Sequence, residues 1–378
     1  MNDTAPTAEE GRAELEIPQT ILRRSGFAAA APLFSADLAS ATDLAEATRV
    51  VTSHGRRLWT EAIRQDSPDD RPLYWARLGL TARLRGWQPT FELGGDDFRT
   101  LLRRLEHAAR GHDDLVFPPD DRLLRVIVTG FDPYRLDEDL RRSNPTGAAA
   151  LDLNGATFDI GEHTAVVRTA IFPVRWRDLT DGIVERALLS QYTATAAAAD
   201  AVITLSEGDS DDFVLVSHAC PWRDDAVDNE RVRAPGATPL DQAPYPRTQP
   251  QWSPSTLPRR SIVEQGSGRF VVRENTEITE IPPGREEAEV TARGPTPGSR
   301  ARAGGAGAGF ANEVTYRNTR LRAATQRTIP AGHVITPALR PPPEGSEDTV
   351  ALDGTSLERD RTDILDQLRA IVTAALTV

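Results

Sequence analysis

The chain has 378 residues, a net charge of −12, 39% hydrophobic residues and 26% charged residues. This length allows one large or two medium domains with a packed core, and the negative charge argues against a nucleic-acid surface. The sequence has no apolar run long enough to span a membrane and no signal peptide, so we expect a cytoplasmic protein. The single cysteine, Cys220, excludes an internal disulfide and a cysteine-rich zinc site. We expect neither a metal nor a cofactor.

The first third of the chain is predicted to be helical. Residues 1–15 are polar and acidic, which predicts a disordered tail. From 16 to 120 we expect a helical extension. Apolar residues recur at spacings of three and four over Leu44–Gln65, and Pro72 and Asp96 lie where two further helices would begin.

Residues 121–345 have the pattern of an α/β core. Leu123–Val128, Ala165–Phe172 and Ala201–Leu205 read as buried strands, and residues 178–196 read as a helix between the second and the third. Strands and helices that alternate in this way indicate a mostly parallel twisted sheet. We therefore predict an α/β/α sandwich, preceded by the α-helical N-terminal region.

Two later segments complete the predicted organisation. An insertion at about 231–303 interrupts the core, and alternating residues within it, over Gly268–Ile281, predict an added β-hairpin. Residues 346–378 are expected to end the chain with an amphipathic helix.

A glycine-rich segment, Gly304–Tyr316, reads GGAGAGFANEVTY and predicts a tight turn into a helix N-terminus. Such a turn presents free backbone N–H groups and the positive end of a helix dipole, which suit a thiolate or an oxyanion. Ala311 lies at the junction, and its side chain can be neither a nucleophile nor a base.

Several short motifs occur in the same order as in one peptidase family. They are Val128–Tyr134 (VTGFDPY), Asn144-Pro145, Phe172–Val174, Asp200–Ile203 followed by Glu207-Gly208, Asp228–Glu230, Ser255–Pro258 and Gly332–Pro337. With the glycine-rich turn, this order resembles the pyroglutamyl peptidases (pyrrolidone-carboxylate peptidases), cysteine peptidases of an α/β/α fold. The helical extension and the insertion resemble a larger, actinobacterial-type branch of that family.

The resemblance implies roles for particular residues. Phe131 and Tyr134 match aromatic residues that stack on the pyroglutamyl ring, and Asn144 and Glu207 are expected to line the same substrate pocket. His333 matches the general base of the family.

Two catalytic positions depart from the family pattern. Ala311 stands where the nucleophilic cysteine belongs, and Val216 stands where a glutamate orients the histidine. A hydrolase of this type needs a nucleophile, a base and a carboxylate that fixes the base. The sequence therefore predicts a catalytically impaired or inactive homologue that keeps a pocket for a small pyroglutamyl or peptide-like ligand.

Two alternatives stay open at this stage. An active amide hydrolase could use His333 with Cys220 as the nucleophile, or with Glu207 or Glu313 to activate water. A structural or partner-binding role through the helical extension is the other alternative. The sequence leaves the oligomeric state open.

Overall fold

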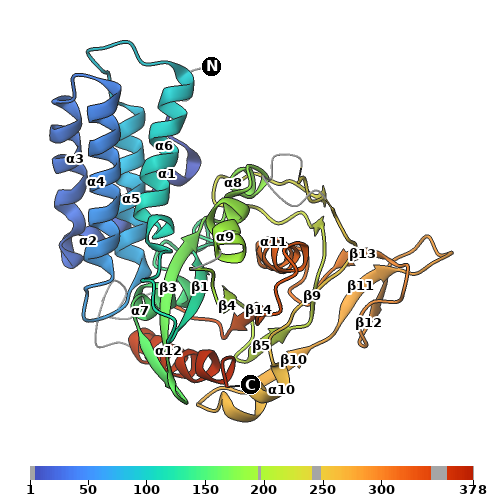
Figure 1. The fold of residues 1–378 in the computed structure, drawn as a ribbon. Helices are drawn as coiled ribbons and strands as arrows, with labels where there is room; N and C mark the ends of the chain where they lie inside the picture. The colour runs from blue at the N-terminus through green and yellow to red at the C-terminus, as the bar shows by residue number, and fades with distance from the viewer. Residues whose placement is uncertain (1–4, 195–196, 241–247, 342–355, 378) are drawn as a thin grey trace.

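The computed structural model describes residues 5–194, 197–240, 248–341 and 356–377. Its N-terminal part is a group of helices that stands beside a central sheet (Figure 1). Large apolar side chains fill the helical part, among them Phe34, Trp59 and Trp75, because the helices present apolar faces to one another. The helical region predicted before the first strand is confirmed. Its helices are α1 (Ala8–Arg12), α2 (Glu16–Ser25), α3 (Ala30–Ala39), α4 (Leu44–Ala62), α5 (Asp70–Arg85) and α6 (Gly95–Ala109), with 3-10 turns η1 (Phe27–Ala29) and η2 (His112–Asp114).

The disorder predicted for the N-terminal tail is wrong for residues 5–15. Thr7 and Glu10 cap α1 reciprocally, since each side chain accepts a hydrogen bond from the backbone N–H of the other. The acidic residues that suggested disorder are buried in ion pairs, with Glu9 at 3.1 Å from Arg175 and Glu10 at 2.8 Å from Arg85. Residues 1–4 lie outside the described residues.

The central sheet has seven strands in the order β10-β5-β14-β4-β1-β3-β2. The strands are β1 (Leu123–Phe131), β2 (Thr157–Ile160), β3 (His163–Phe172), β4 (Ala201–Glu207), β5 (Phe213–Val216), β10 (Val272–Asn275) and β14 (Ala331–Thr336). β14, β4, β1 and β3 are mutually parallel, whereas β5 runs antiparallel to β14 and β2 antiparallel to β3. β-Branched residues such as Val126 and Ile127 are fully buried because helices cover both faces.

Helices cover the two faces of the sheet and make it the middle layer of an α/β/α sandwich, as predicted (Figure 1). α7 (Pro145–Leu153), α10 (Arg259–Gln265) and α12 (Ser356–Ala374) share a core with one face. α8 (Trp176–Thr180), α9 (Ile183–Thr193) and α11 (Phe310–Ala324) pack on the other.

The hairpin predicted over Gly268–Ile281 does not form. β10 instead pairs in parallel with β5 and extends the central sheet, while β11 (Ile278–Ile281) joins a separate sheet with β12 (Glu289–Thr291) and β13 (Arg300–Ala303). β10 can join the central sheet because the backbone groups at the edge of β5 are open to pairing, and β11 pairs instead with β12 and β13. The remaining described strands form two short antiparallel pairs. β6 (His218–Ala219) pairs with β9 (Ser253–Pro254), and β7 (Trp222–Arg223) pairs with β8 (Gly236–Ala237).

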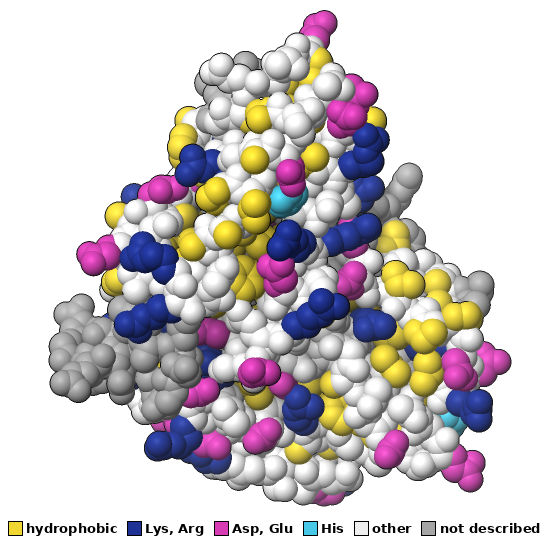
Figure 2. Space-filling model, turned by 90° about the vertical axis from the view of Figure 1, so that its left-hand side faces the viewer, with side chains coloured by type: hydrophobic (Ala, Val, Ile, Leu, Met, Phe, Trp, Pro, Cys, Tyr) yellow, Lys and Arg dark blue, Asp and Glu magenta, His cyan; other side chains and the backbone are white. Residues whose placement is uncertain are grey.

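The surface that faces the viewer in Figure 2 mixes acidic, basic and apolar side chains, and neither sign of charge gathers into a large patch. Among the described helices, none is both long and apolar enough to cross a membrane.

Candidate functional site

A pocket of about 480 Å³ opens where β1 and β4 end and α11 begins. Parallel strands and a helix start meet at this edge of the sheet, which is where α/β proteins commonly bind ligands. Phe131, Tyr134, Asn144, Glu207 and Ala311 all line it. The structure thus brings together the residues that the resemblance assigned to the substrate pocket and to the nucleophile position.

The loop after β1 forms one wall of the pocket. Gly130 lets β1 approach α7 closely, since a Cβ there would lie 2.0 Å from the Thr146 carbonyl oxygen. The Phe131 N–H donates to the hydroxyl of Thr146 (3.0 Å), and Tyr134 follows in the same loop. Burial raises the pKa of the Tyr134 phenol to about 12. The Tyr134 phenol is therefore neutral at pH 7, and the guanidinium groups of Arg135 and Arg142 lie over its ring, 5.2 and 5.5 Å from the centroid.

Asn144 is 2% exposed and is occupied in holding this loop. Its amide nitrogen donates to the Asp132 carbonyl (3.0 Å), and its amide oxygen accepts from the Thr146 N–H (3.0 Å) at the start of α7. Because both ends of its amide are bonded to the backbone, Asn144 shapes the pocket by holding the loop and α7 together.

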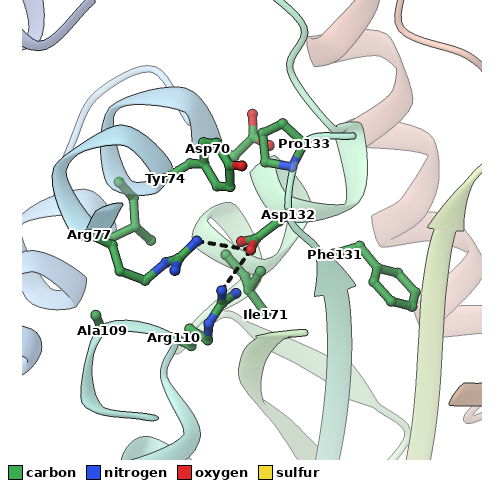
Figure 3. A pocket seen from close by; sticks show the side chains of 10 residues that line it. Asp70, Tyr74, Arg77, Ala109, Arg110, Phe131, Asp132, Pro133 and Ile171 are labelled. Atoms are coloured by element: carbon green, nitrogen blue, oxygen red, sulfur yellow. Dashed lines mark hydrogen bonds and ion pairs between the residues drawn. The ribbon is translucent and has the colours of Figure 1, made fainter. Parts of the chain in front are cut away.

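The helical region supports the same loop from behind. The Asp132 carboxylate accepts from Arg77 (3.0 Å) and forms an ion pair with Arg110 (2.7 Å). Figure 3 shows Asp132 directed at these two guanidinium groups while Phe131 points away from them. Asp70 at the start of α5 accepts from the Asn144 N–H (2.8 Å). The N-terminal region and the pocket are therefore joined by buried charged groups.

Glu207, at the end of β4, brings a carboxyl group to the pocket. One carboxyl oxygen accepts from the Leu339 N–H (2.7 Å), and the other lies 3.6 Å from Arg142. Burial raises the pKa of Glu207 to about 7. Near neutral pH the group exists in both forms, so it can accept a hydrogen bond from a ligand or donate one.

The start of α11 forms the opposite wall. Gly304 and Gly307 exchange backbone hydrogen bonds of 2.7 and 2.9 Å, and the φ of 75° at Gly307 favours glycine. Phe310 stacks on Trp176 with ring centroids 3.9 Å apart, which fixes the direction of the helix. The N-cap residue is Gly309, which has no side chain to cap the helix, and the Asp224 carboxylate lies nearby, 3.7 Å from where a Cβ at Gly309 would be.

His333 lies on β14 beneath this pocket and is fully buried. Its Nδ1 is 2.8 Å from the hydroxyl of Thr204, and its Nε2 is 2.8 Å from the hydroxyl of Ser206, both on β4. Burial lowers the pKa of His333 to about 3, so the imidazole is neutral at pH 7. Ser206 lines the pocket and separates His333 from it.

The remaining candidate residues lie outside the pocket lining. Val216 is fully buried at the end of β5. Cys220 is also fully buried, and burial raises the pKa of its thiol to about 12, so it is not a thiolate at neutral pH. Glu313 forms ion pairs with Arg223 and Arg317.

Sequence reasoning did not single out Ser206 or Thr204. The signal was the alternation along β4, where Thr204 and Ser206 stand two residues apart among the apolar residues that precede Glu207. Such alternation directs both hydroxyls to the same face of the sheet as His333.

Two family models and one curated relative match most of the chain, and all three carry the name PA0049. A family model described as the PA0049 N-terminal domain matches residues 1–106, and one described as the PA0049 C-terminal domain matches residues 125–245 and 267–340. The uncharacterized protein PA0049 of Pseudomonas aeruginosa is 27% identical, with 94% of this chain and 84% of that protein covered.

Among solved structures, two mutants of pyrrolidone carboxyl peptidase from Pyrococcus furiosus are similar. Each is 20% identical and covers 67% of this chain and 98% of its own, with TM-scores of 0.45 and 0.43. Since the C-terminal-domain model alone matches more than half of the residues, the chain belongs to the PA0049 family.

Proposed function

We propose that this chain is a pyroglutamyl-peptidase-like protein that binds a pyroglutamyl or similar small amide and does not hydrolyse it by cysteine chemistry. One observation carries the proposal. The aromatic loop residues Phe131 and Tyr134, the carboxyl of Glu207 and the alanine at the helix start line a single pocket of about 480 Å³.

The pocket suits a small lactam in size and in chemistry. Its volume lies within the roughly 300–1,000 Å³ that is usual for small-molecule sites. Phe131 and Phe310 offer apolar surface to the methylene groups of a five-membered ring. Glu207 can accept from a lactam N–H, and the first turn of α11 can donate to a carbonyl oxygen.

The loss of cysteine chemistry follows from two side chains. A methyl group at Ala311 cannot attack a carbonyl, and Val216 supplies no carboxylate to stabilise a protonated His333. Losing a nucleophile of this kind typically lowers the rate by several orders of magnitude.

The alternative that relocates the nucleophile to Cys220 has less support. The thiol is fully buried, does not line the pocket and has its pKa raised to about 12. The alternative that pairs His333 with Glu313 meets a similar obstacle, because Arg223 and Arg317 already bind that carboxylate.

The proposal is tested by the thermal shift that pyroglutamyl amide produces. A ligand that binds only the folded state raises the melting temperature by mass action, whereas prolinamide, which lacks the lactam carbonyl, should have little effect. Ala311→Leu extends a side chain from the pocket wall and should abolish the shift. Ala323→Leu, at an exposed position on the same helix, is the matched control and should keep it. No shift with the wild-type protein, or an equal shift in Ala311→Leu, would overturn the proposal.

A further inference from the structure

Four groups form a continuous chain of hydrogen bonds from the pocket wall into the core. The hydroxyl of Ser206 lies 2.8 Å from Nε2 of His333, and Nδ1 of His333 lies 2.8 Å from the hydroxyl of Thr204. That hydroxyl in turn donates to the carbonyl oxygen of Gly332 at 3.1 Å. Ser206 is the member of this chain that lines the pocket.

The carbonyl of Gly332, at the end of this series of hydrogen bonds, determines which atom donates in each of them. A carbonyl oxygen can only accept, so the single hydroxyl proton of Thr204 is used on Gly332. Thr204 must then accept from His333 through an N–H at Nδ1. This tautomer leaves the lone pair of Nε2 to accept the hydroxyl proton of Ser206.

A serine whose proton points at a neutral imidazole, itself oriented by a third group, has the arrangement of an activated nucleophile. His333 is fully buried and neutral at pH 7, so its Nε2 lone pair can accept a proton, but burial lowers its pKa to about 3 and makes it a weak base. The pocket that Ser206 lines is also lined by the first residues of α11, whose N–H groups are the donors on offer to an oxyanion, with the Asp224 carboxylate beside them.

We propose that Ser206 is a nucleophile for acyl transfer, with His333 as its general base, and that its substrates are small carboxylic esters. The inference rests on the pocket of the proposed function, which would hold the acyl group. The Ser206 oxygen attacks the ester carbonyl carbon as its proton passes to Nε2 of His333. The tetrahedral oxyanion collapses, the C–O bond to the alcohol breaks, and His333 returns the proton to the departing alkoxide. Water then hydrolyses the acyl-serine by the same route.

Esters are favoured over amides because the base is weakly supported. Thr204 offers His333 a hydroxyl oxygen, whereas the family position for a carboxylate holds the apolar Val216. An ester carbonyl is more electrophilic than an amide carbonyl, and its alkoxide can leave without being protonated first, so ester cleavage depends less on the strength of the base.

A fluorophosphonate probe tests the inference, because an activated serine displaces its fluoride and keeps the phosphonyl group. We expect intact-mass analysis to show one adduct and peptide mapping to place it on Ser206. Ser206→Ala should reduce labelling to background. His333→Gln should slow labelling by about 100-fold or more.

Ser217→Ala is the matched control. Ser217 also lies within hydrogen-bond distance of a histidine, 3.1 Å from Nδ1 of His218, but it is 1% exposed and does not line the pocket. This variant should be labelled like the wild-type protein. Ser206→Cys gives a second readout if Ser206→Ala is unstable, since iodoacetamide should alkylate the new thiol and leave the buried Cys220 unmodified.

The outcomes separate this inference from the proposed function. An unlabelled wild-type protein that still binds pyroglutamyl amide, or an adduct on another residue, would overturn the assignment of Ser206 and leave the ligand pocket standing. Labelling of Ser206 without any pyroglutamyl binding would support Ser206 and overturn the proposed ligand.

Discussion

Glu207 offers a quantitative test of how the pocket is built. Its carboxyl group is 9% exposed, and burial raises its pKa from the ordinary 4.5 to about 7. A carboxyl group with a raised pKa in the folded state favours folding while it is protonated, and it opposes folding as pH rises from 4.5 through 7. The difference of about 2.5 pH units, at about 1.4 kcal/mol per unit, amounts to about 3 kcal/mol above pH 7.

Replacing Glu207 by glutamine removes this penalty while keeping an oxygen for the Leu339 N–H. Glu207→Gln should therefore raise the free energy of unfolding by about 1 kcal/mol at pH 5 and by about 3 kcal/mol at pH 8.5. Equilibrium urea unfolding at the two pH values measures both differences. Glu138→Gln, which removes an exposed carboxylate from the rim of the same pocket, controls for the loss of a charge. A Glu207→Gln variant that is less stable than wild type at pH 8.5 would refute the reasoning, because Arg142 would then outweigh burial.

Three further predictions concern the groups around the pocket. Asp132→Asn should lower the free energy of unfolding by about 3 kcal/mol in urea denaturation, since it leaves the buried guanidinium groups of Arg77 and Arg110 less compensated; a loss below 1 kcal/mol would contradict the role given to this cluster. His333 has a pKa of about 3 when folded against 6.5 when unfolded, so the unfolded state binds its proton first and stability falls as pH drops below 6.5. At pH 5 this costs about 2 kcal/mol, and the pH dependence of unfolding should be correspondingly shallower in His333→Gln; an equal slope in both proteins would exclude a buried neutral imidazole. The thiol of Cys220 should react with a disulfide reagent in urea but not in the native protein, and a fast native reaction would show that the thiol is accessible.

Much of the core could be predicted from local patterns. β1 and β4 are short runs of β-branched residues, and α4 repeats apolar residues at helical spacing, so their types follow from periodicity. The pocket loop and Ala311 are singled out through the resemblance of short motifs to those of the pyroglutamyl peptidases, and these motifs lie at strand and helix ends that line one pocket.

The features that sequence reasoning missed depend on partners far away in the chain. α1 is ordered because Glu9 forms an ion pair with Arg175 and Glu10 forms one with Arg85 of α5. The sequence of a charged segment gives no local sign of such distant partners. β10 pairs with β5 because the sheet edge is free there, which the sequence of the insertion cannot indicate. Ser206 becomes a candidate only when the register of β4 and β14 brings it to His333.

Calorimetric titration with pyroglutamyl amide tests the central claim most directly, with the ligand recovered and analysed afterwards. The account predicts saturable heat at one site per chain and intact ligand at the end, because the pocket is complete and Ala311 cannot act as a nucleophile. Absence of heat would contradict the proposed ligand. Recovery of pyroglutamate and ammonia, with the reaction lost in His333→Gln, would contradict the loss of peptidase chemistry.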